Sequence, residues 1–257
     1  MKISELLAKY ETFCPKELAV AGDPVGLQVG NPHQNLSKVL VTLDIREQTV
    51  QEAKALGVEL IIAKHPLIFR PLSALTSLDK QQKLVLDLAA AGIAVYTSHT
   101  NIDVVNGGLN DYFCQLFNLS DVEILDDDEG VGRIGNLAPT SLLALSEQVK
   151  QVFGLKHLRL VTYEHDLNQK ISRLALCGGS GGKFWEKAVE KGADAYLTGD
   201  IYYHVGHDML SAGLVGIDPG HYIEQAFIPL VANKLRDFAP SLTIFESQAA
   251  TNPFYDI

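Results

Sequence analysis

The segment Val58-Glu59-Leu60-Ile61-Ile62-Ala63 decides the fold of this chain, because a matching segment, Ala193-Asp194-Ala195-Tyr196-Leu197-Thr198, follows 135 residues later. Each segment begins just after a glycine, Gly57 or Gly192, that ends a helical pattern. Short apolar runs of this kind are typical of strands that are buried on both faces of a parallel sheet. The pair therefore indicates two copies of one α/β unit.

The repeat extends to both sides of these two segments. Before them, residues 38–42 correspond to residues 173–177; after them, residues 91–96 correspond to residues 212–217 across a shorter connection. Strands that alternate with crossover helices form largely parallel sheets. The sequence thus predicts the α/β class, with two similar three-layer α/β lobes that arose by internal duplication.

The acidic run Asp126-Asp127-Asp128-Glu129-Gly130 is the strongest candidate boundary between the lobes. Acidic runs are commonly solvated linkers. We therefore expect a first lobe at residues 1–128 and a second lobe at residues 129–257.

Composition excludes several classes of protein. The 257 residues carry a net charge of −10 and no long basic run, which argues against nucleic-acid binding. No apolar run approaches the ~20 residues of a membrane span, and the N-terminus is typical of an amphipathic helix, not of a signal peptide. Cys14, Cys114 and Cys177 form no paired motif, so we expect no disulfide framework, no thiolate zinc site and a cytoplasmic location.

Polar side chains stand where the predicted strands end. These imidazoles and carboxylates are His65, His99, Asp103, Asp200, His204, His221 and Glu224. Ligands of open α/β sheets gather at the carboxyl ends of the strands. We therefore expect the two lobes to face each other across a metal-binding cleft, with the metal site shared between both lobes.

The chemistry of this set favours a metal. His221 and Glu224 are three residues apart at the start of a helix and so lie on one face. Imidazole and carboxylate without thiolate suit Zn, Mn, Fe or Co, and a bridging Asp103 or Glu224 could hold two ions about 3.5–4 Å apart for hydrolysis. Structural roles are the alternatives: a satisfied strand-end His65, a helix-capping Asp103 and a Glu224 that complements the helix dipole.

The run Gly178-Gly179-Ser180-Gly181-Gly182-Lys183 follows a strand and opens a helix. Backbone N–H groups at such a corner can cradle a phosphate, although Phe184 stands where a Walker A loop needs Ser or Thr. The run also matches the Gly-x-Ser-x-Gly elbow of serine hydrolases, with Ser180 as nucleophile, Asp200 or Asp218 as acid and His221 as base. Tight strand-to-helix packing is the structural alternative.

Four ordered motifs carry a family resemblance. They are Lys64-His65-Pro66-Leu67-Ile68-Phe69, His99-Thr100-Asn101-Ile102-Asp103, Thr198-Gly199-Asp200 and Asp218-Pro219-Gly220-His221-Tyr222-Ile223-Glu224. With the loop at residues 22–30, they make the chain resemble the Nif-three-like family from end to end. Members of that family are named GTP cyclohydrolase I type 2 homologues, and this chain resembles the short form without an inserted domain.

The resemblance implies a dinuclear metal site inside a toroidal homohexamer. The ligands that it implies are His65, Asp103, His221 and Glu224, with one or two Zn, Fe, Mn or Co ions per subunit. The family usually has His-His-Pro where this chain has Lys64-His65-Pro66. An ammonium is a poor ligand, so Lys64 either leaves one ion weakly held or absent, or faces an anionic substrate.

For function, the resemblance implies a metal-dependent hydrolase that acts on GTP or another small phosphorylated molecule. A water activated by the ion would attack, and His99 or His204 would shuttle protons. The alternatives are a metal-stabilised scaffold or regulatory interaction protein without enzymatic activity and the serine hydrolase built on Ser180.

Overall fold

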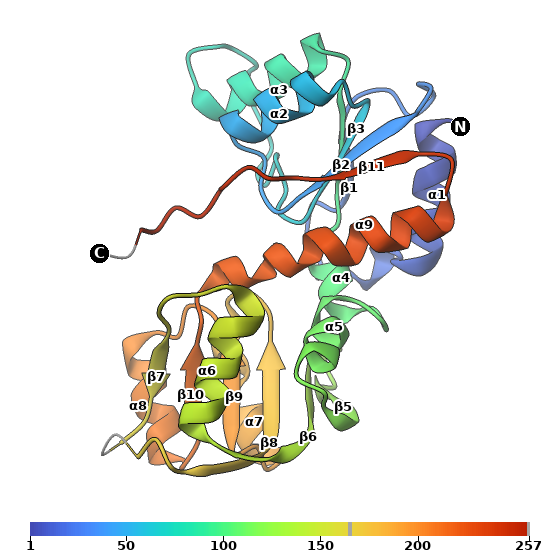
Figure 1. Ribbon diagram of the computed structural model, residues 1–257. Coiled ribbons are helices and arrows are strands. Elements are labelled where there is room, and N and C mark those ends of the chain that lie inside the picture. The colour runs from blue at the N-terminus through green and yellow to red at the C-terminus, as the bar shows by residue number, and fades with distance from the viewer. Residues whose placement is uncertain (164–165, 256–257) are drawn as a thin grey trace. The chain divides into compact units, whose positions relative to one another are not determined.

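The computed structural model describes residues 1–163 and 166–255, which form two compact units. The first unit consists of Met1–Val105 and Phe227–Tyr255, and the second consists of Asn106–Ala226. Each unit is an α/β structure with its own sheet and its own covering helices (Figure 1). The predicted α/β class and the two similar lobes are confirmed.

The first sheet has the strand order β1-β4-β3-β2-β11. Its strands are β1 (Gly26–Val29), β2 (Lys38–Thr42), β3 (Leu60–Ala63), β4 (Ala94–Thr97) and β11 (Thr243–Glu246). All neighbouring pairs are parallel except β1, which runs antiparallel to β4. Every residue of β3 and β4 is buried, as a strand covered by helices on both faces requires.

Helices cover both faces of this sheet. They are α1 (Ile3–Phe13), α2 (Glu47–Leu56), α3 (Lys80–Ala90) and α9 (Phe227–Phe238); the unit also contains α4 (Thr100–Val104) and the 3₁₀ turn η1 (Lys16–Leu18), which contact each other. Val50 of α2 and Leu88 of α3 pack in one hydrophobic cluster with Ile61 of β3, whereas α9 contacts α1, β2 and β11. The predicted glycine cap is present, since Gly57 ends α2 with φ +64°.

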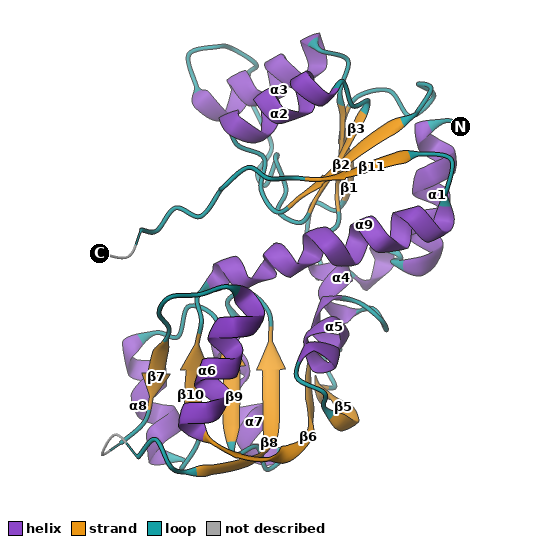
Figure 2. Cartoon of the chain, viewed as in Figure 1, coloured by secondary structure: helices purple, strands orange, loops and turns teal. Residues whose placement is uncertain are grey.

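The second sheet has the strand order β5-β6-β8-β9-β10-β7. Its strands are β5 (Ser120–Asp126), β6 (Val131–Ser141), β7 (Arg159–Val161), β8 (Lys170–Cys177), β9 (Ala195–Thr198) and β10 (Val215–Asp218). The central strands β8, β9 and β10 are parallel, and the other strands are antiparallel to their neighbours. Figure 2 shows this sheet among its helices.

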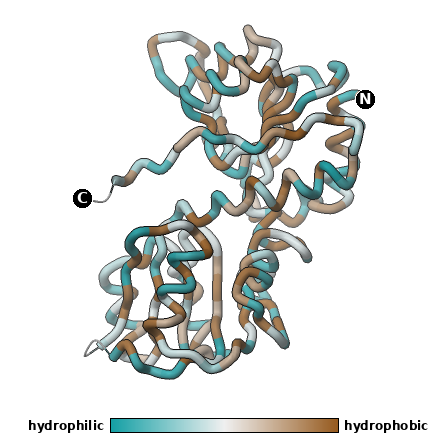
Figure 3. The backbone as a smooth tube through the Cα atoms, in the orientation of Figure 1, coloured by the Kyte–Doolittle hydropathy of each residue, from teal (hydrophilic) through white to brown (hydrophobic). Residues whose placement is uncertain are grey.

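The helices of the second unit are α5 (Leu109–Leu116), α6 (Leu142–Phe153), α7 (Trp185–Glu190) and α8 (Tyr203–Ser211), with the 3₁₀ turns η2 (Gly181–Phe184) and η3 (His221–Ala226). Ala188 of α7 and Met209 of α8 pack on Tyr196 of β9, whereas Phe113 of α5 stacks edge-on against Phe153 of α6. Figure 3 shows the apolar character of the strands. Burial of each large aliphatic side chain stabilises a fold by roughly 1.5–3 kcal/mol.

The predicted duplication is visible in the strand register. In the first unit Val39 pairs with Leu60, and in the second unit Leu174 pairs with Ala195, with each residue 135 positions after its counterpart. Leu60 also pairs with Ala94, as Ala195 pairs with Val215. The parallel cores β2-β3-β4 and β8-β9-β10 therefore share the same strand order and register.

The acidic run is not a linker between units. It forms the turn of the β5–β6 hairpin inside the second unit, where Asp126 is buried and accepts a hydrogen bond from the Glu129 N–H at 3.0 Å. The exposed carboxylates of the run pair with lysines around α7, for example Asp127 with Lys191 at 2.8 Å. These local pairs explain why the turn is acidic.

The division of the chain accordingly differs from the predicted lobes 1–128 and 129–257. The chain passes into the second unit after Val105, and Phe227 returns it to the first. The C-terminal segment is an integral part of the first unit, because α9 packs on β2 and β11 pairs with β2 at the edge of the first sheet. Within the described residues, no helix has the length and apolar character to cross a membrane.

Candidate metal centre

His221 and Glu224 lie in η3, directly after β10 in the second unit. The 3₁₀ geometry places residues three apart above one another, and His221 Nε2 lies 3.0 Å from Glu224 Oε2. Glu224 is only 2% exposed. An imidazole nitrogen beside a buried carboxylate oxygen is a donor pair that can hold a divalent ion.

The other nitrogen of His221 faces a second carboxylate. Nδ1 lies 2.8 Å from Asp200 Oδ2, in the turn after β9, and 3.1 Å from Ser180 Oγ. Ser180 in turn donates a hydrogen bond to Asp200. Asp200 can hold the proton of Nδ1, and in that tautomer the lone pair of Nε2 can bind a metal.

The carboxylates of Asp200 and Glu224 on the two sides of His221 favour a positive charge between them. The hydrogen bond to Glu224 raises the pKa of His221 most; burial opposes the rise, Asp200 adds to it, and the pKa reaches about 9. Burial acts to raise the pKa of Asp200, but hydrogen bonds from Ser180 and His221 outweigh it, so the pKa is lowered. Without a metal the proton supplies the positive charge, and a divalent ion can take its place. The residues present therefore fit a metal.

Close backbone packing builds this corner. A Cβ on Gly179 would lie 3.0 Å from Glu224 Oε1, and a Cβ on Gly199 would lie 2.8 Å from the backbone nitrogen of His221. Gly179 also has φ +63°, which favours glycine. Gly179 thus makes room for the Glu224 carboxylate, whereas a Cβ on Gly181 would lie 2.7 Å from Cys177 Cβ, which is the close packing that the structural alternative predicts.

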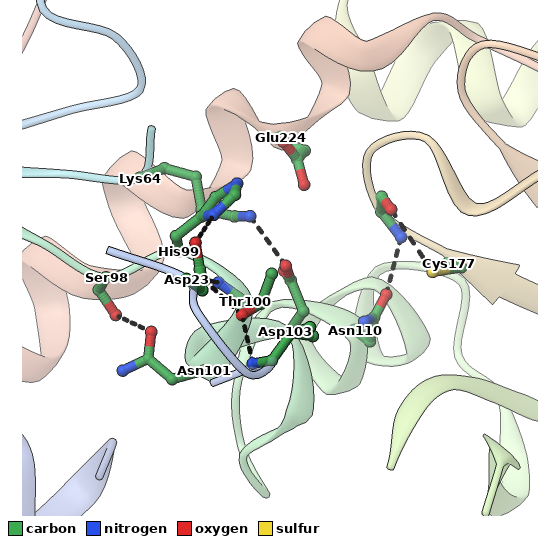
Figure 4. Close-up of polar contacts among 12 residues, drawn as sticks. Asp23, Lys64, Ser98, His99, Thr100, Asn101, Asp103, Asn110, Cys177 and Glu224 are labelled. Atoms are coloured by element: carbon green, nitrogen blue, oxygen red, sulfur yellow. Dashed lines mark hydrogen bonds and ion pairs between the residues drawn. The ribbon is translucent and has the colours of Figure 1, made fainter. Parts of the chain in front are cut away.

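Two N–H groups of the same run are used inside the fold. Gly178 donates to Asn110 Oδ1 and Gly181 donates to Thr198 Oγ1, both at 2.9 Å. Figure 4 shows the contact of Asn110. These two donors are therefore engaged within the protein and do not face a phosphate.

Asp218 has a structural position. It is buried at the end of β10, where it accepts hydrogen bonds from the N–H groups of Ile201 and Gly220 and pairs with Arg159. Its hydrogen bond with Gly220 stabilises the Asp-Pro-Gly turn, which leads directly into His221. Of the two acids considered for a serine hydrolase, Asp200 is the one that contacts Ser180.

In the first unit, Lys64 and Asp103 form an ion pair. Lys64 follows β3 and Asp103 lies in α4, with Lys64 Nζ 2.9 Å from Asp103 Oδ2 (Figure 4). Lys64 is 1% exposed and Asp103 8%. Asp103 does not cap the next helix, α5, whose N-cap is Gly108.

Two histidines of the first unit repeat the arrangement of His221. His65 Nδ1 lies 2.8 Å from Asp44 Oδ1, and His99 Nδ1 lies 2.7 Å from Asp23 Oδ1. The two imidazole rings meet edge to face with centroids 5.9 Å apart. The Asp23 carboxylate also accepts hydrogen bonds from Thr100, as Figure 4 shows. In both rings a carboxylate holds Nδ1 and so fixes the orientation of the imidazole.

The pKa values of Asp44 and Asp23 agree with their role as carboxylate partners of His65 and His99. Burial acts to raise the pKa of Asp44 and of Asp23, but hydrogen bonds with His65 and His99 respectively outweigh it, and both values are lowered. Both acids are therefore carboxylates at neutral pH. Our sequence interpretation gave neither acid a role, although Asp44 follows β2 closely and so stands at a strand end.

His204 differs from the other candidates. It is exposed on the first turn of α8, where its ring contacts Tyr203 with centroids 5.4 Å apart. Cys14, Cys114 and Cys177 are buried and are not joined in disulfides, and burial raises the pKa of the Cys14 and Cys114 thiols to about 12.

Comparison with known proteins shows which family this chain resembles. Residues 1–253 match the sequence profile of Duf34/NIF3 (NGG1p interacting factor 3). The chain is 74% identical to the GTP cyclohydrolase 1 type 2 homolog of Lactococcus lactis and 50% identical to that of Streptococcus pneumoniae, in each case over 100% of both chains. The solved structure of a Bacillus cereus protein related to NIF3 superposes with a TM-score of 0.94 at 28% identity, covering 100% of this chain and 99% of that one.

Proposed function

The chain belongs to the Duf34/NIF3 family, and from this premise we propose that it is a metal-dependent hydrolase. The observation that carries the proposal is His221, which lies between Asp200 at Nδ1 and the buried Glu224 at Nε2. A carboxylate behind a ligand histidine fixes its tautomer and raises its basicity, as in many metal enzymes.

The proposed ligands are those that the sequence resemblance implies: His65, Asp103, His221 and Glu224. His65 and Asp103 belong to the first unit and His221 and Glu224 to the second, so the proposal is one centre shared by both. The donor chemistry supports it, because His65 also has its Nδ1 fixed by a carboxylate. A divalent ion of the Zn, Fe, Mn or Co type would polarise the substrate and activate a water at neutral pH.

The protein's own residues would then manage protons. We assign His99 as the proton shuttle, since Asp23 holds its Nδ1 proton and leaves Nε2 to accept or return another. His204, the other candidate shuttle, is exposed on α8 and lacks a described carboxylate of this kind among its contacts. We therefore rank it second.

The substrate class in the proposal is a nucleotide-like or other small phosphorylated molecule. Support comes from the relatives, whose name contains GTP cyclohydrolase. Opening the purine ring of GTP would require water to attack the carbon between two ring nitrogens. We further propose a homohexamer in the cytoplasm; three buried thiols that are not joined in disulfides suit a reducing compartment.

The serine-hydrolase alternative has one observation in its favour, because Ser180, Asp200 and His221 do meet. A triad histidine uses one nitrogen for the serine and the other for the acid. Here Ser180 and Asp200 share Nδ1, and Nε2 faces Glu224. This arrangement suits a metal-ligand histidine better than a general base.

The test combines metal content with turnover. Protein purified without a histidine tag is analysed by plasma mass spectrometry and is then screened for formate or phosphate release from GTP and related nucleotides. We expect bound transition metal and chelator-sensitive turnover, both lost in His221→Ala/Glu224→Ala and retained in the exposed-histidine control His207→Ala. Absence of metal from metal-replete protein would refute the proposal, and bound metal without turnover would favour the scaffold alternative.

A further inference from the structure

Lys64 is a cation buried beside one of the proposed metal ligands. Its ammonium lies 2.9 Å from Asp103 Oδ2 and its side chain is 1% exposed. Removing an ammonium from water is costly unless a carboxylate or other strong acceptors compensate for the lost hydration. Asp103 supplies that compensation, and its own negative charge is neutralised in return.

The second unit shows the same position without a lysine. The register that pairs β2-β3-β4 and β8-β9-β10 makes Gly199 the counterpart of Lys64, because both directly follow the central strand. The same register makes Glu224 the counterpart of Asp103: Asp103 lies six residues after Thr97, as Glu224 does after Asp218, and these two strand ends correspond. At Glu224 the neighbour is an imidazole, which can bind a metal.

Resting on the proposed function, we propose that the Lys64 ammonium replaces a second metal ion at Asp103, so that the centre holds one divalent ion per chain. A carboxylate that bridges two ions offers one oxygen to each. Asp103 Oδ2 is already the acceptor of Lys64. A second divalent ion at that oxygen would also be repelled by the ammonium, which has no lone pair to donate while it is charged.

The substitution Lys64→His provides the direct test. It removes the fixed charge and adds a ligand, and Lys64→Arg is the matched control that keeps the charge and cannot bind metal. Each protein is stripped with a chelator, reloaded with excess Co²⁺ or Mn²⁺, freed of unbound metal and analysed by plasma mass spectrometry. Circular dichroism confirms that each variant is folded.

We expect one ion per chain in the unchanged protein and in Lys64→Arg, and two in Lys64→His. With Mn²⁺, electron paramagnetic resonance should show an isolated ion in the first two proteins and an exchange-coupled pair in Lys64→His. Adding Asp103→Asn to Lys64→His should return the content to one ion.

Two outcomes would overturn this inference while leaving the proposed function intact. Two ions in the unchanged protein would show that Lys64 does not occupy a metal position, and a folded Lys64→His with one ion would show that Lys64 does not set the number. No ion in any of the proteins would instead refute the proposed metal function, and the inference with it. Two ions in the unchanged protein would overturn the inference even if Lys64→His does not fold.

Discussion

The two units share one framework and differ in the cation that they place beside a carboxylate. Both have a parallel core with the same register, and both present an acid after the third strand of that core, Asp103 in one and Glu224 in the other. Asp103 has Lys64 as its partner, whereas Glu224 has His221. An ammonium has no lone pair for a metal, but an imidazole can exchange its proton for one. The shared framework thus places an acid at the same position in both units, while the cationic partner comes from different positions, Lys64 after β3 and His221 in η3.

The largest effect should come from breaking the ion pair of the first unit. In metal-free protein, Lys64→Met should lower the free energy of unfolding by about 3–5 kcal/mol, because the buried Asp103 carboxylate loses the ammonium 2.9 Å away. The double variant Lys64→Met/Asp103→Asn should regain part of the loss. Urea unfolding followed by circular dichroism measures both.

The control for that prediction is Lys183→Met, which breaks the exposed pair of Lys183 with Glu129 and should cost no more than about 1 kcal/mol. If Lys64→Met were as mild as Lys183→Met, the ion pair at Asp103 would not be a buried one in solution.

The next effect concerns the acid behind His221. Asp200→Asn removes the carboxylate that holds Nδ1 and should weaken metal binding about 10–100-fold. Competition with a chromophoric chelator measures the affinity. The matched control Asp208→Asn changes an exposed acid on α8 and should leave the affinity unchanged. Equal affinities for all three proteins would remove Asp200 from the centre.

The pH dependence of metal binding should reveal the environment of His221. Its pKa is raised to about 9, chiefly by the hydrogen bond to Glu224, so a metal must displace a proton at every pH below that value. Affinity should therefore rise with pH, by up to about tenfold per pH unit, and level off near pH 9. A plateau already near the ordinary histidine value of about 6.5 would contradict the paired geometry.

The smallest effect should come from Ser180. Ser180→Ala removes one hydrogen bond to Asp200 while His221 keeps its own, so metal affinity should change by about fivefold or less, or about 1 kcal/mol. The hydrolysis rate should be retained to a similar extent. A folded, metal-loaded Ser180→Ala variant without activity would instead support Ser180 as a nucleophile.

Sequence patterns predicted the parts of the fold that depend on local apolar runs. The central strands β3 and β9 stand out because each is fully buried, and Gly57 and Gly192 mark the helix ends before them. The edge strands were not predicted. β11, for example, is only partly buried and joins the first sheet from the far end of the chain, so its position depends on pairing with β2 and not on its own pattern.

In the candidate site, too, local contacts were predicted and contacts between distant parts of the sequence were not. The pairing of His221 with Glu224 follows from their spacing of three residues, a local property. The carboxylates behind His65 and His99 come from Asp44 and Asp23, which lie 21 and 76 residues away in the sequence. The partner of Lys64 is 39 residues away. Such contacts depend on how the strands assemble in the folded chain, so they cannot be predicted from the spacing of residues in the sequence.

Anomalous diffraction would locate the bound metal. Crystals of metal-loaded protein would be measured at the absorption edge of the bound metal. We expect one strong anomalous peak per chain, within bonding distance of His221 Nε2 and the Glu224 carboxylate, with the Lys64 ammonium still on Asp103. A peak remote from His221 and Glu224, or no peak at all, would contradict it.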